Sequence, residues 1–326
     1  MDAMTSSSAP RVSVVLGSGG ARGYAHIGVI TELRARGYEI AAISGSSMGA
    51  LVGGLQAAGR LDEFAEWAKS LTQGAVLRLL DPSFTSAGVL RAGKILDVVR
   101  DILGDIDIER LPIPYTAVAT DLIAGRSVWL QHGPVDTAIR ASIAIPGVIA
   151  PHVVDGRLLA DGGILDPLPM APLCAVNADL TLAVSLNGGD PVPTPDPEEG
   201  VQTRRLTRMM RSTSALLDTS GARSLLDRPT ARAILDRFSS SESEPGDDDA
   251  TEGTGAPKLG SFEVMNRTID IAQSALTRHQ LAAYPPDVLI EVPRTACRSL
   301  DFHRAAELIE VGRKLTARAL DNAKPG

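Results

Sequence analysis

Ser47 is the residue whose surroundings in the sequence most clearly suggest chemistry. It is the middle residue of Gly45-Ser46-Ser47-Met48-Gly49, a Gly-x-Ser-x-Gly pentapeptide. Glycines two residues before and after a serine allow a sharp turn that lifts the hydroxyl clear of the backbone. The pentapeptide therefore predicts a nucleophile elbow, in which the Ser47 hydroxyl attacks a carbonyl carbon. The alternative is a tight turn that contains a serine by chance.

The segments on either side of the pentapeptide favour the elbow. Residues Glu39–Ile43 are mostly apolar and predict a short buried strand, and Ala50–Ala58 predict a helix of small residues. A nucleophile elbow needs this strand–turn–helix context. The first turn of the helix also directs free N–H groups and the positive end of its dipole toward a developing oxyanion.

A glycine-rich loop at Gly17–Gly23 is the predicted source of further oxyanion donors. It follows an apolar strand at Arg11–Leu16 and precedes a helix that runs to about Arg36. Its glycines let a substrate approach the backbone N–H groups closely. Such donors stabilise the negative oxygen of a tetrahedral intermediate.

Two glycine-rich segments resemble nucleotide-binding motifs in spacing, but each lacks a residue that its motif requires. The first loop has Arg22 where a dinucleotide fingerprint needs its third glycine, and no acidic residue ends the second strand. The segment Gly88–Ile95 has the spacing of a phosphate-binding P-loop. However, Ile95 replaces the magnesium-binding Ser or Thr, and no strand precedes it. We interpret this segment as a loop that enters a helix.

The base that activates Ser47 has two kinds of candidate. Histidine is the usual base, and the chain has five: His26, His132, His152, His279 and His303. None lies in a recognisable catalytic turn, and we interpret them as packing or surface residues. Asp161 follows a short apolar strand and precedes two glycines, which places it at a strand end, where sites in parallel sheets gather. The residues alone leave both candidates open.

The remaining pattern alternates between strand and helix, which predicts an α/β fold with a parallel sheet covered by helices. The further predicted helices are Asp62–Leu71, Ala92–Leu103, Val135–Ser142, Phe262–Tyr284 and Phe302–Leu320. The further predicted strands are Pro114–Thr120, Arg126–Leu130, Leu158–Ala160, Leu180–Leu186 and Asp287–Glu291.

We predict one domain at 11–326, preceded by a disordered N-terminus at 1–10 and interrupted by an insertion or lid at 187–260. Within the insertion, 239–257 holds six acidic residues and no basic one. Such a tract buries too little apolar surface to become ordered. Residues 201–238 are helical in pattern, and 201–217 interleave arginines with an apolar stripe. That helix is predicted to act as a lid over the site or to lie on a membrane surface.

The composition excludes several classes of protein. The net charge of −7 excludes a general nucleic-acid binder. Residues 1–10 lack the basic and apolar regions of a secretory signal, and no apolar run is long enough to cross a bilayer. We therefore expect a cytoplasmic protein.

Cys174 and Cys297 have no metal-binding spacing, and we expect both to be buried.

Four motifs together resemble the patatin-like phospholipases in order and approximate spacing. They are the Gly17–Gly23 loop, the Gly45–Gly49 pentapeptide, Ala141-Ser142-x-x-x-Pro146 and Asp161-Gly162-Gly163. The stretch Gly19–Val29 is most similar to the bacterial branch related to the neuropathy target esterase catalytic domain. The resemblance covers about residues 11–186. Ser18 departs from it, because the family more often has glycine there.

The resemblance implies a patatin-like three-layer α/β/α sandwich with a mainly parallel central sheet. It also implies a Ser–Asp dyad without histidine, in which Ser47 is the nucleophile and Asp161 the base. The oxyanion hole would be formed by the loop residues Gly19, Gly20, Ala21 and Arg22. Arg22 would orient this loop or meet a lipid phosphate.

The implied activity is hydrolysis of carboxylic esters in lipid metabolism, of the phospholipase A or lysophospholipase type. It proceeds through an acyl-enzyme and needs no metal or organic cofactor. Two other functions stay open. One is a regulatory protein that keeps the fold without catalysis, and the other is a histidine-dependent serine esterase or acyltransferase.

Overall fold

The computed structural model describes residues 9–79, 93–146, 148–189 and 261–323. These residues belong to one compact unit, in which the chain before residue 192 packs with the chain after residue 258. They contain an eight-stranded sheet in the order β5-β6-β3-β2-β1-β7-β8, with β4 paired to β3. The strands are β1 (Arg11–Leu16), β2 (Glu39–Ser46), β3 (Tyr115–Asp121), β4 (Arg126–Leu130), β5 (His152–Val154), β6 (Arg157–Asp161), β7 (Leu180–Gly188) and β8 (Val288–Pro293).

The centre of the sheet is parallel and buried on both faces. Strands β3, β2, β1, β7 and β8 pair in parallel, whereas β4, β5 and β6 pair antiparallel at one side. Along β1, Val12, Val14 and Leu16 join the large hydrophobic core, and Val15 joins a second cluster. A strand buried on both faces needs a nearly continuous apolar run, which β1 provides.

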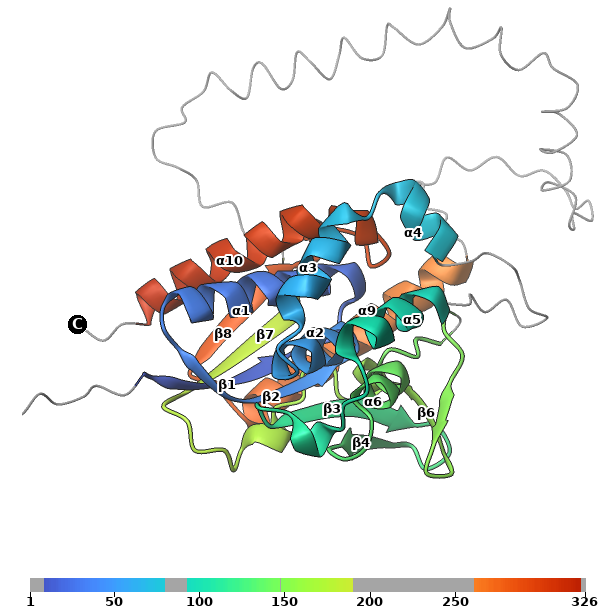
Figure 1. The fold of residues 1–326 in the computed structure, drawn as a ribbon, viewed down its shortest axis with the longest axis horizontal. Coiled ribbons are helices and arrows are strands. Elements are labelled where there is room, and N and C mark those ends of the chain that lie inside the picture. The colour runs from blue at the N-terminus through green and yellow to red at the C-terminus, as the bar shows by residue number, and fades with distance from the viewer. Residues whose placement is uncertain (1–8, 80–92, 147, 190–260, 324–326) are drawn as a thin grey trace, which may run out of the picture. The chain divides into compact units, whose positions relative to one another are not determined.

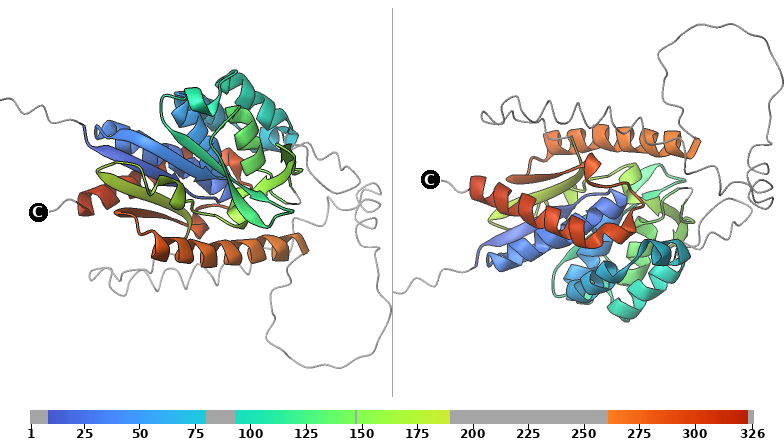
Figure 2. Two further views of the ribbon diagram at one scale, coloured as in Figure 1. Left: turned by 90° about the horizontal axis from the view of Figure 1, so that it is seen from below. Right: turned by 90° about the horizontal axis from the view of Figure 1, so that it is seen from above.

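Helices cover both faces of this sheet. On one face lie α1 (Ala25–Ala35), α2 (Met48–Ala57) and α10 (Ala305–Asn322), with α3 (Leu61–Ser70), α4 (Gln73–Leu79), α5 (Gly93–Leu103) and α6 (Val135–Ser142) around them (Figure 1). The long helix α9 (Ser261–Ala283) lies on the opposite face (Figure 2). There Leu281 of α9 packs on a cluster that includes Leu168 and Met170. The predicted three-layer α/β/α sandwich with a mainly parallel sheet is confirmed.

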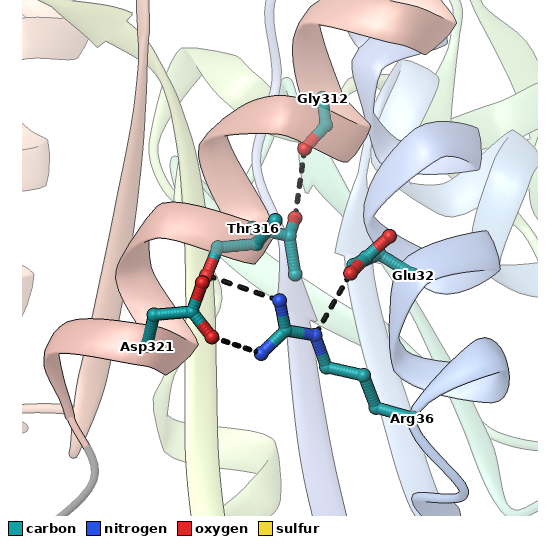
Figure 3. A network of polar contacts seen from close by, with 6 residues as sticks. Glu32, Arg36, Gly312, Thr316 and Asp321 are labelled. Carbon is teal, nitrogen blue, oxygen red and sulfur yellow. Dashed lines mark hydrogen bonds and ion pairs between the residues drawn. The ribbon is translucent and has the colours of Figure 1, made fainter.

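A polar network joins the C-terminal helix α10 to α1. The guanidinium of Arg36, just after α1, donates to Glu32 at 2.8 Å and to Asp321 of α10 at 2.6 Å (Figure 3). The hydroxyl of Thr316 donates to the carbonyl of Gly312 at 2.8 Å within α10. Because α1 begins at the end of the glycine-rich loop, α10 supports the helix that carries this loop.

The main differences from the sequence-based expectations lie at the ends of elements. Strand β7 extends through Gly188, so 187 and 188 belong to the sheet and not to the predicted insertion. The short strand β5 was not predicted. Of the N-terminus at 1–10 that was expected to be disordered, residues 1–8 lie outside the described residues, whereas the carbonyl of Pro10 accepts from the amide of Glu39 at 2.9 Å. The expected disorder at 239–257 and the expected helix at 201–238 also lie outside the described residues. Cys297 is buried as expected, but Cys174 is exposed because it ends a short 3₁₀ turn at the surface, and that expectation was wrong.

Candidate active site

The site lies where two strands end against each other on one edge of β3. Strand β2 runs parallel to β3 and ends with Ser46 opposite Val118. Strand β6 runs antiparallel to β3 and ends with Asp161 opposite Ala119, the next residue along β3. The carboxyl ends of β2 and β6 therefore meet, although they are far apart in the sequence. This junction brings the predicted site residues Ser47 and Asp161 together.

The turn after β2 has the backbone of a nucleophile elbow. Ser47 has φ 56° and ψ −122°, a conformation that non-glycine residues rarely adopt. The two flanking glycines are sterically required. A Cβ atom on Gly45 would overlap the backbone of Gly49, and one on Gly49 would overlap the carbonyl of Leu16. Ser47 is followed at once by the first turn of α2, as the pentapeptide predicts.

The side chains of Ser47 and Asp161 are hydrogen-bonded to each other. The Ser47 hydroxyl donates to Oδ2 of Asp161 at 2.5 Å. The other carboxylate oxygen, Oδ1, accepts from the amide of Gly163 at 2.7 Å, which fixes the plane of the carboxylate. Thr120 of β3 donates to the backbone carbonyl of Asp161 at 2.9 Å. Both Ser47 and Asp161 are only 3% exposed.

Burial changes the acidity of the Asp161 carboxyl group. Desolvation raises the pKa of Asp161 to about 6, and the hydrogen bonds from Ser47 and Gly163 oppose this rise. At neutral pH the group is still a carboxylate. Its basicity is higher than that of an exposed aspartate, which suits a group that takes a proton and returns it.

Ser142, at the end of α6, holds the elbow in place. Its hydroxyl accepts from the amide of Ser47 at 2.9 Å and donates to the carbonyl of Val118 at 2.6 Å. It therefore ties the elbow to β3 at the point where β2 stops. From the sequence, Ser142 was named only as part of the Ala141–Pro146 motif. The position of Ser142 in the sequence did not indicate its hydrogen bond to Ser47.

The glycine-rich loop is held by three of its amides. The amide of Gly17 donates to the carbonyl of Val184 at 3.0 Å, and that of Ser18 donates to the carbonyl of Pro167 at 2.8 Å. The amide of Ala21 donates to the carbonyl of Ser299 at 2.9 Å. Within the described ranges, the amides of Gly19 and Gly20 have no backbone acceptor, and both residues line the pocket around Ser47. Of the predicted oxyanion residues, Gly19 and Gly20 thus keep available N–H groups, whereas the amide of Ala21 is engaged.

Arg22 lies buried beside this pocket. Its Nη2 is 3.7 Å from the Asp270 carboxylate, and its side chain is 5% exposed. Burial lowers the pKa of the guanidinium, and the charge of Asp270 opposes this effect. Among the described residues, neither Nε nor Nη2 has a hydrogen-bond acceptor. The sequence did not point to Asp270 or to its neighbour Gln273, because both come from α9, more than a hundred residues after Asp161.

Two pockets meet at Ser47. The first has about 670 Å³ of space, partly open to solvent, and we call it the polar pocket because its wall contains charged and polar side chains among apolar ones; its lining includes Gly19, Arg22, Asp161, Asp270, Gln273 and Ser299. The second, the apolar pocket, has about 770 Å³ of space, also partly open to solvent, and its walls include Met48, Leu51, Phe64, Trp67, Ile95 and Phe302. Gly20, Ser47, Ile145, Val148 and Leu300 line both. An ester bound at Ser47 can therefore place an apolar arm on one side and a polar arm on the other.

The histidines lie away from these pockets. In the part of the chain that the structure describes, no histidine lines either pocket. His132 is a surface residue near Glu109, with an 82% exposed side chain. His26 is buried, with Nε2 2.8 Å from the carbonyl oxygen of Gly17. The described residues also include no group of three His, Cys, Asp or Glu side chains that could hold a metal ion.

Comparisons with known proteins relate the chain to esterases. The family model described as patatin-like phospholipase matches residues 14–173. NTE family proteins of Mycobacterium tuberculosis and Mycobacterium bovis, themselves described as uncharacterized, are 68% identical over 333 residues, covering 97% of this chain and 92% of theirs. Neuropathy target esterase sws of Drosophila melanogaster is 31% identical over 186 residues, covering 55% of this chain and 13% of that longer protein.

Among solved structures, VipD from Legionella pneumophila is similar with a TM-score of 0.42 and 15% identity, covering 97% of this chain and 67% of that chain. The motif-based resemblance is confirmed by the match of the family model. It is also confirmed by the mycobacterial NTE family proteins, which align with nearly the whole of this chain. The chain therefore belongs to the patatin-like phospholipase family, among its NTE-type members.

Proposed function

We propose that this protein is a serine acyl hydrolase of the phospholipase A or lysophospholipase type, with Ser47 and Asp161 as a two-residue catalyst. Membership of the family implies esterase activity on lipids. The finer assignment is carried by one observation, the 2.5 Å hydrogen bond from the hydroxyl of Ser47, in its strained elbow, to the buried carboxylate of Asp161.

In the proposed reaction, Asp161 takes the hydroxyl proton of Ser47 while the Ser47 oxygen bonds to the ester carbonyl carbon. The carbonyl oxygen becomes an oxyanion that accepts hydrogen bonds from the amides of Gly19 and Gly20. Collapse of this intermediate breaks the ester bond, and Asp161 gives its proton to the departing alcohol. Asp161 then deprotonates a water that attacks the acyl-Ser47 ester, which releases the fatty acid and restores the Ser47 hydroxyl.

The two pockets suggest how a lipid would lie in the site. The acyl chain fits the apolar pocket, whose walls offer almost no polar atoms. The alcohol part fits the polar pocket, where Nε and Nη2 of Arg22 have no hydrogen-bond acceptor among the described residues and the guanidinium charge suits a phosphate oxygen. Contact with a membrane through residues 201–217 belongs to this proposal as well and lies outside the described residues. Within the described ranges, no helix is both long and apolar enough to span a bilayer.

The test is covalent trapping followed by substrate competition. The protein is treated with a fluorophosphonate, and mass spectrometry identifies the labelled residue. We expect one phosphonyl group on Ser47, no label in Ser47→Ala, and protection by phospholipid or lysophospholipid. Hydrolysis of a short p-nitrophenyl ester by the wild type, absent in Ser47→Ala, separates an enzyme from a non-catalytic regulatory protein. Label on another residue with hydrolysis intact in Ser47→Ala would refute the assignment.

A further inference from the structure

His26 is a buried group that the proposed reaction does not use. It lies in the first turn of α1 and is 0% exposed. Its Nε2 is 2.8 Å from the carbonyl oxygen of Gly17. Since a carbonyl oxygen only accepts, Nε2 carries the proton and donates it. Among the described residues, Nδ1 has no partner. Among the described residues, the one hydrogen bond of this side chain is therefore directed at the glycine-rich loop.

The imidazole is neutral when the enzyme works. Burial lowers the pKa of His26 to about 4, and the hydrogen bond to Gly17 opposes this shift. A neutral imidazole with its proton on Nε2 is a fixed hydrogen-bond donor. It lines neither pocket, so its effect on an ester at Ser47 has to pass through Gly17.

Gly17 connects the two halves of the site. It follows the last paired residue of β1, Leu16, so its carbonyl lies beyond the regular ladder of the sheet. A Cβ atom on Gly49 would come within 2.9 Å of the Gly17 oxygen, which shows how closely this carbonyl approaches the elbow. Two and three residues later come Gly19 and Gly20, which line the pocket around Ser47 and whose amides have no backbone acceptor among the described residues. A shift of Gly17 would thus move the amide donors relative to Ser47.

We infer that His26 is a positioning residue, which holds the Gly17 carbonyl so that the amides of Gly19 and Gly20 stay aimed at the oxyanion. This role rests on the proposed function, because it concerns the oxyanion of the ester reaction. A buried carbonyl that loses its donor is destabilised and tends to move toward another one. Such a movement weakens binding of the transition state more than binding of the substrate.

The experiment compares two substitutions that differ in reach. In His26→Gln the side-chain amide nitrogen can take the place of Nε2, whereas in His26→Asn it stops near the place of Nδ1. For a short p-nitrophenyl ester we expect His26→Asn to lower kcat by about 10- to 100-fold with little change in KM. His26→Gln should recover most of the kcat. Hydrogen–deuterium exchange of a peptide covering 17–23 should be faster in His26→Asn and close to wild type in His26→Gln.

Controls separate this role from stability and from base catalysis. His132→Asn, at an exposed site, should keep wild-type kcat. The acid limb of the pH profile should stay in place in His26→Asn, because Asp161 remains the base. Should His26→Asn not fold, His26→Met replaces it as a variant without a donor. A folded non-donor variant with wild-type kcat, or His26→Gln as slow as His26→Asn, would overturn the inference. A wild type without esterase activity would overturn the proposed function and this role with it.

Discussion

The amide of Ser47 donates a hydrogen bond of 2.9 Å to the hydroxyl of Ser142, and this bond fixes the elbow from outside the turn. Ser142 in turn donates to the carbonyl of Val118 at 2.6 Å. One small side chain thus satisfies two buried backbone groups at the point where β2 and β6 meet on β3. The strained backbone of Ser47 is maintained by its surroundings, as strained conformations at functional sites must be.

Ser142→Ala should therefore lower both stability and activity. It leaves the Ser47 amide and the Val118 carbonyl without their shared partner, which costs about 1–3 kcal/mol in the free energy of unfolding. Urea denaturation measures this loss, and kcat for a short p-nitrophenyl ester measures the effect on the elbow. Ser70→Ala is the matched control, because the Ser70 hydroxyl bonds to the carbonyl of Trp67 at an exposed site. Equal stability in both variants would contradict the role of Ser142.

Asp161→Asn should remove esterase activity while keeping the fold. The amide oxygen of asparagine can still accept from Gly163, but the side chain cannot take the Ser47 proton at neutral pH. Loss of a general base lowers kcat by about 10²–10⁴-fold. His279→Ala and His303→Ala should keep most of the activity, since neither histidine lines a pocket. An active Asp161→Asn together with an inactive histidine variant would favour a histidine-dependent esterase.

Activity and stability should change in opposite directions as the pH rises through the acid range. The pKa of Asp161 is raised to about 6, so kcat/KM should fall below pH 6 as the base becomes protonated. In the unfolded chain the pKa of this carboxyl is near 3.8, the ordinary value for aspartate. The folded state therefore binds the proton more tightly, and the contribution of Asp161 to stability decreases between about pH 4 and pH 6.

The buried carboxyl of Asp166, also raised to a pKa of about 6, adds a change in stability with the same sign. A pH–rate profile of kcat/KM and urea denaturation at several pH values check the two trends. In Asp161→Asn the fall in stability over this pH range should be smaller, and Asp166 accounts for what is left. A rate that is flat from pH 5 to pH 8 would contradict Asp161 as the base.

Local sequence pointed to Ser47 and its turn, whereas the choice of Asp161 over a histidine came from the family resemblance and not from the residues alone. The Gly45–Gly49 pentapeptide determines a tight turn by steric exclusion, and the Asp-Gly-Gly sequence identifies a strand end. Strand β6 runs antiparallel to β3 and ends opposite Ala119. This arrangement depends on which strands pair, and the sequence of β6 does not specify its partner strand. For the same reason Asp270 and Gln273 were missed, because α9 reaches the site only through packing on the sheet. His26 was interpreted as a packing or surface residue. It lies in the stretch Gly19–Val29 that resembles the family, but the sequence does not show that its side chain bonds to Gly17.

Filling the apolar pocket should change the preferred acyl length without stopping the chemistry. Ile95 of α5 is half-buried and lines this pocket but not the polar one. In Ile95→Trp the larger ring takes space that the far part of a long acyl chain would occupy. Each methylene that loses its apolar contact forfeits about 0.8 kcal/mol. We therefore expect kcat/KM for p-nitrophenyl decanoate to fall by about 10- to 100-fold, while the value for the acetate stays close to wild type.

The matched control for this substitution is Leu289→Trp, which adds the same ring at an exposed position on β8, away from both pockets. It should leave the hydrolysis of both esters unchanged. The ratio of decanoate to acetate hydrolysis is the decisive quantity, because a general loss of folded enzyme lowers both rates equally. An unchanged ratio in folded Ile95→Trp would mean that the acyl chain does not enter the apolar pocket. The chain would then have to share the polar pocket with the alcohol part of the lipid.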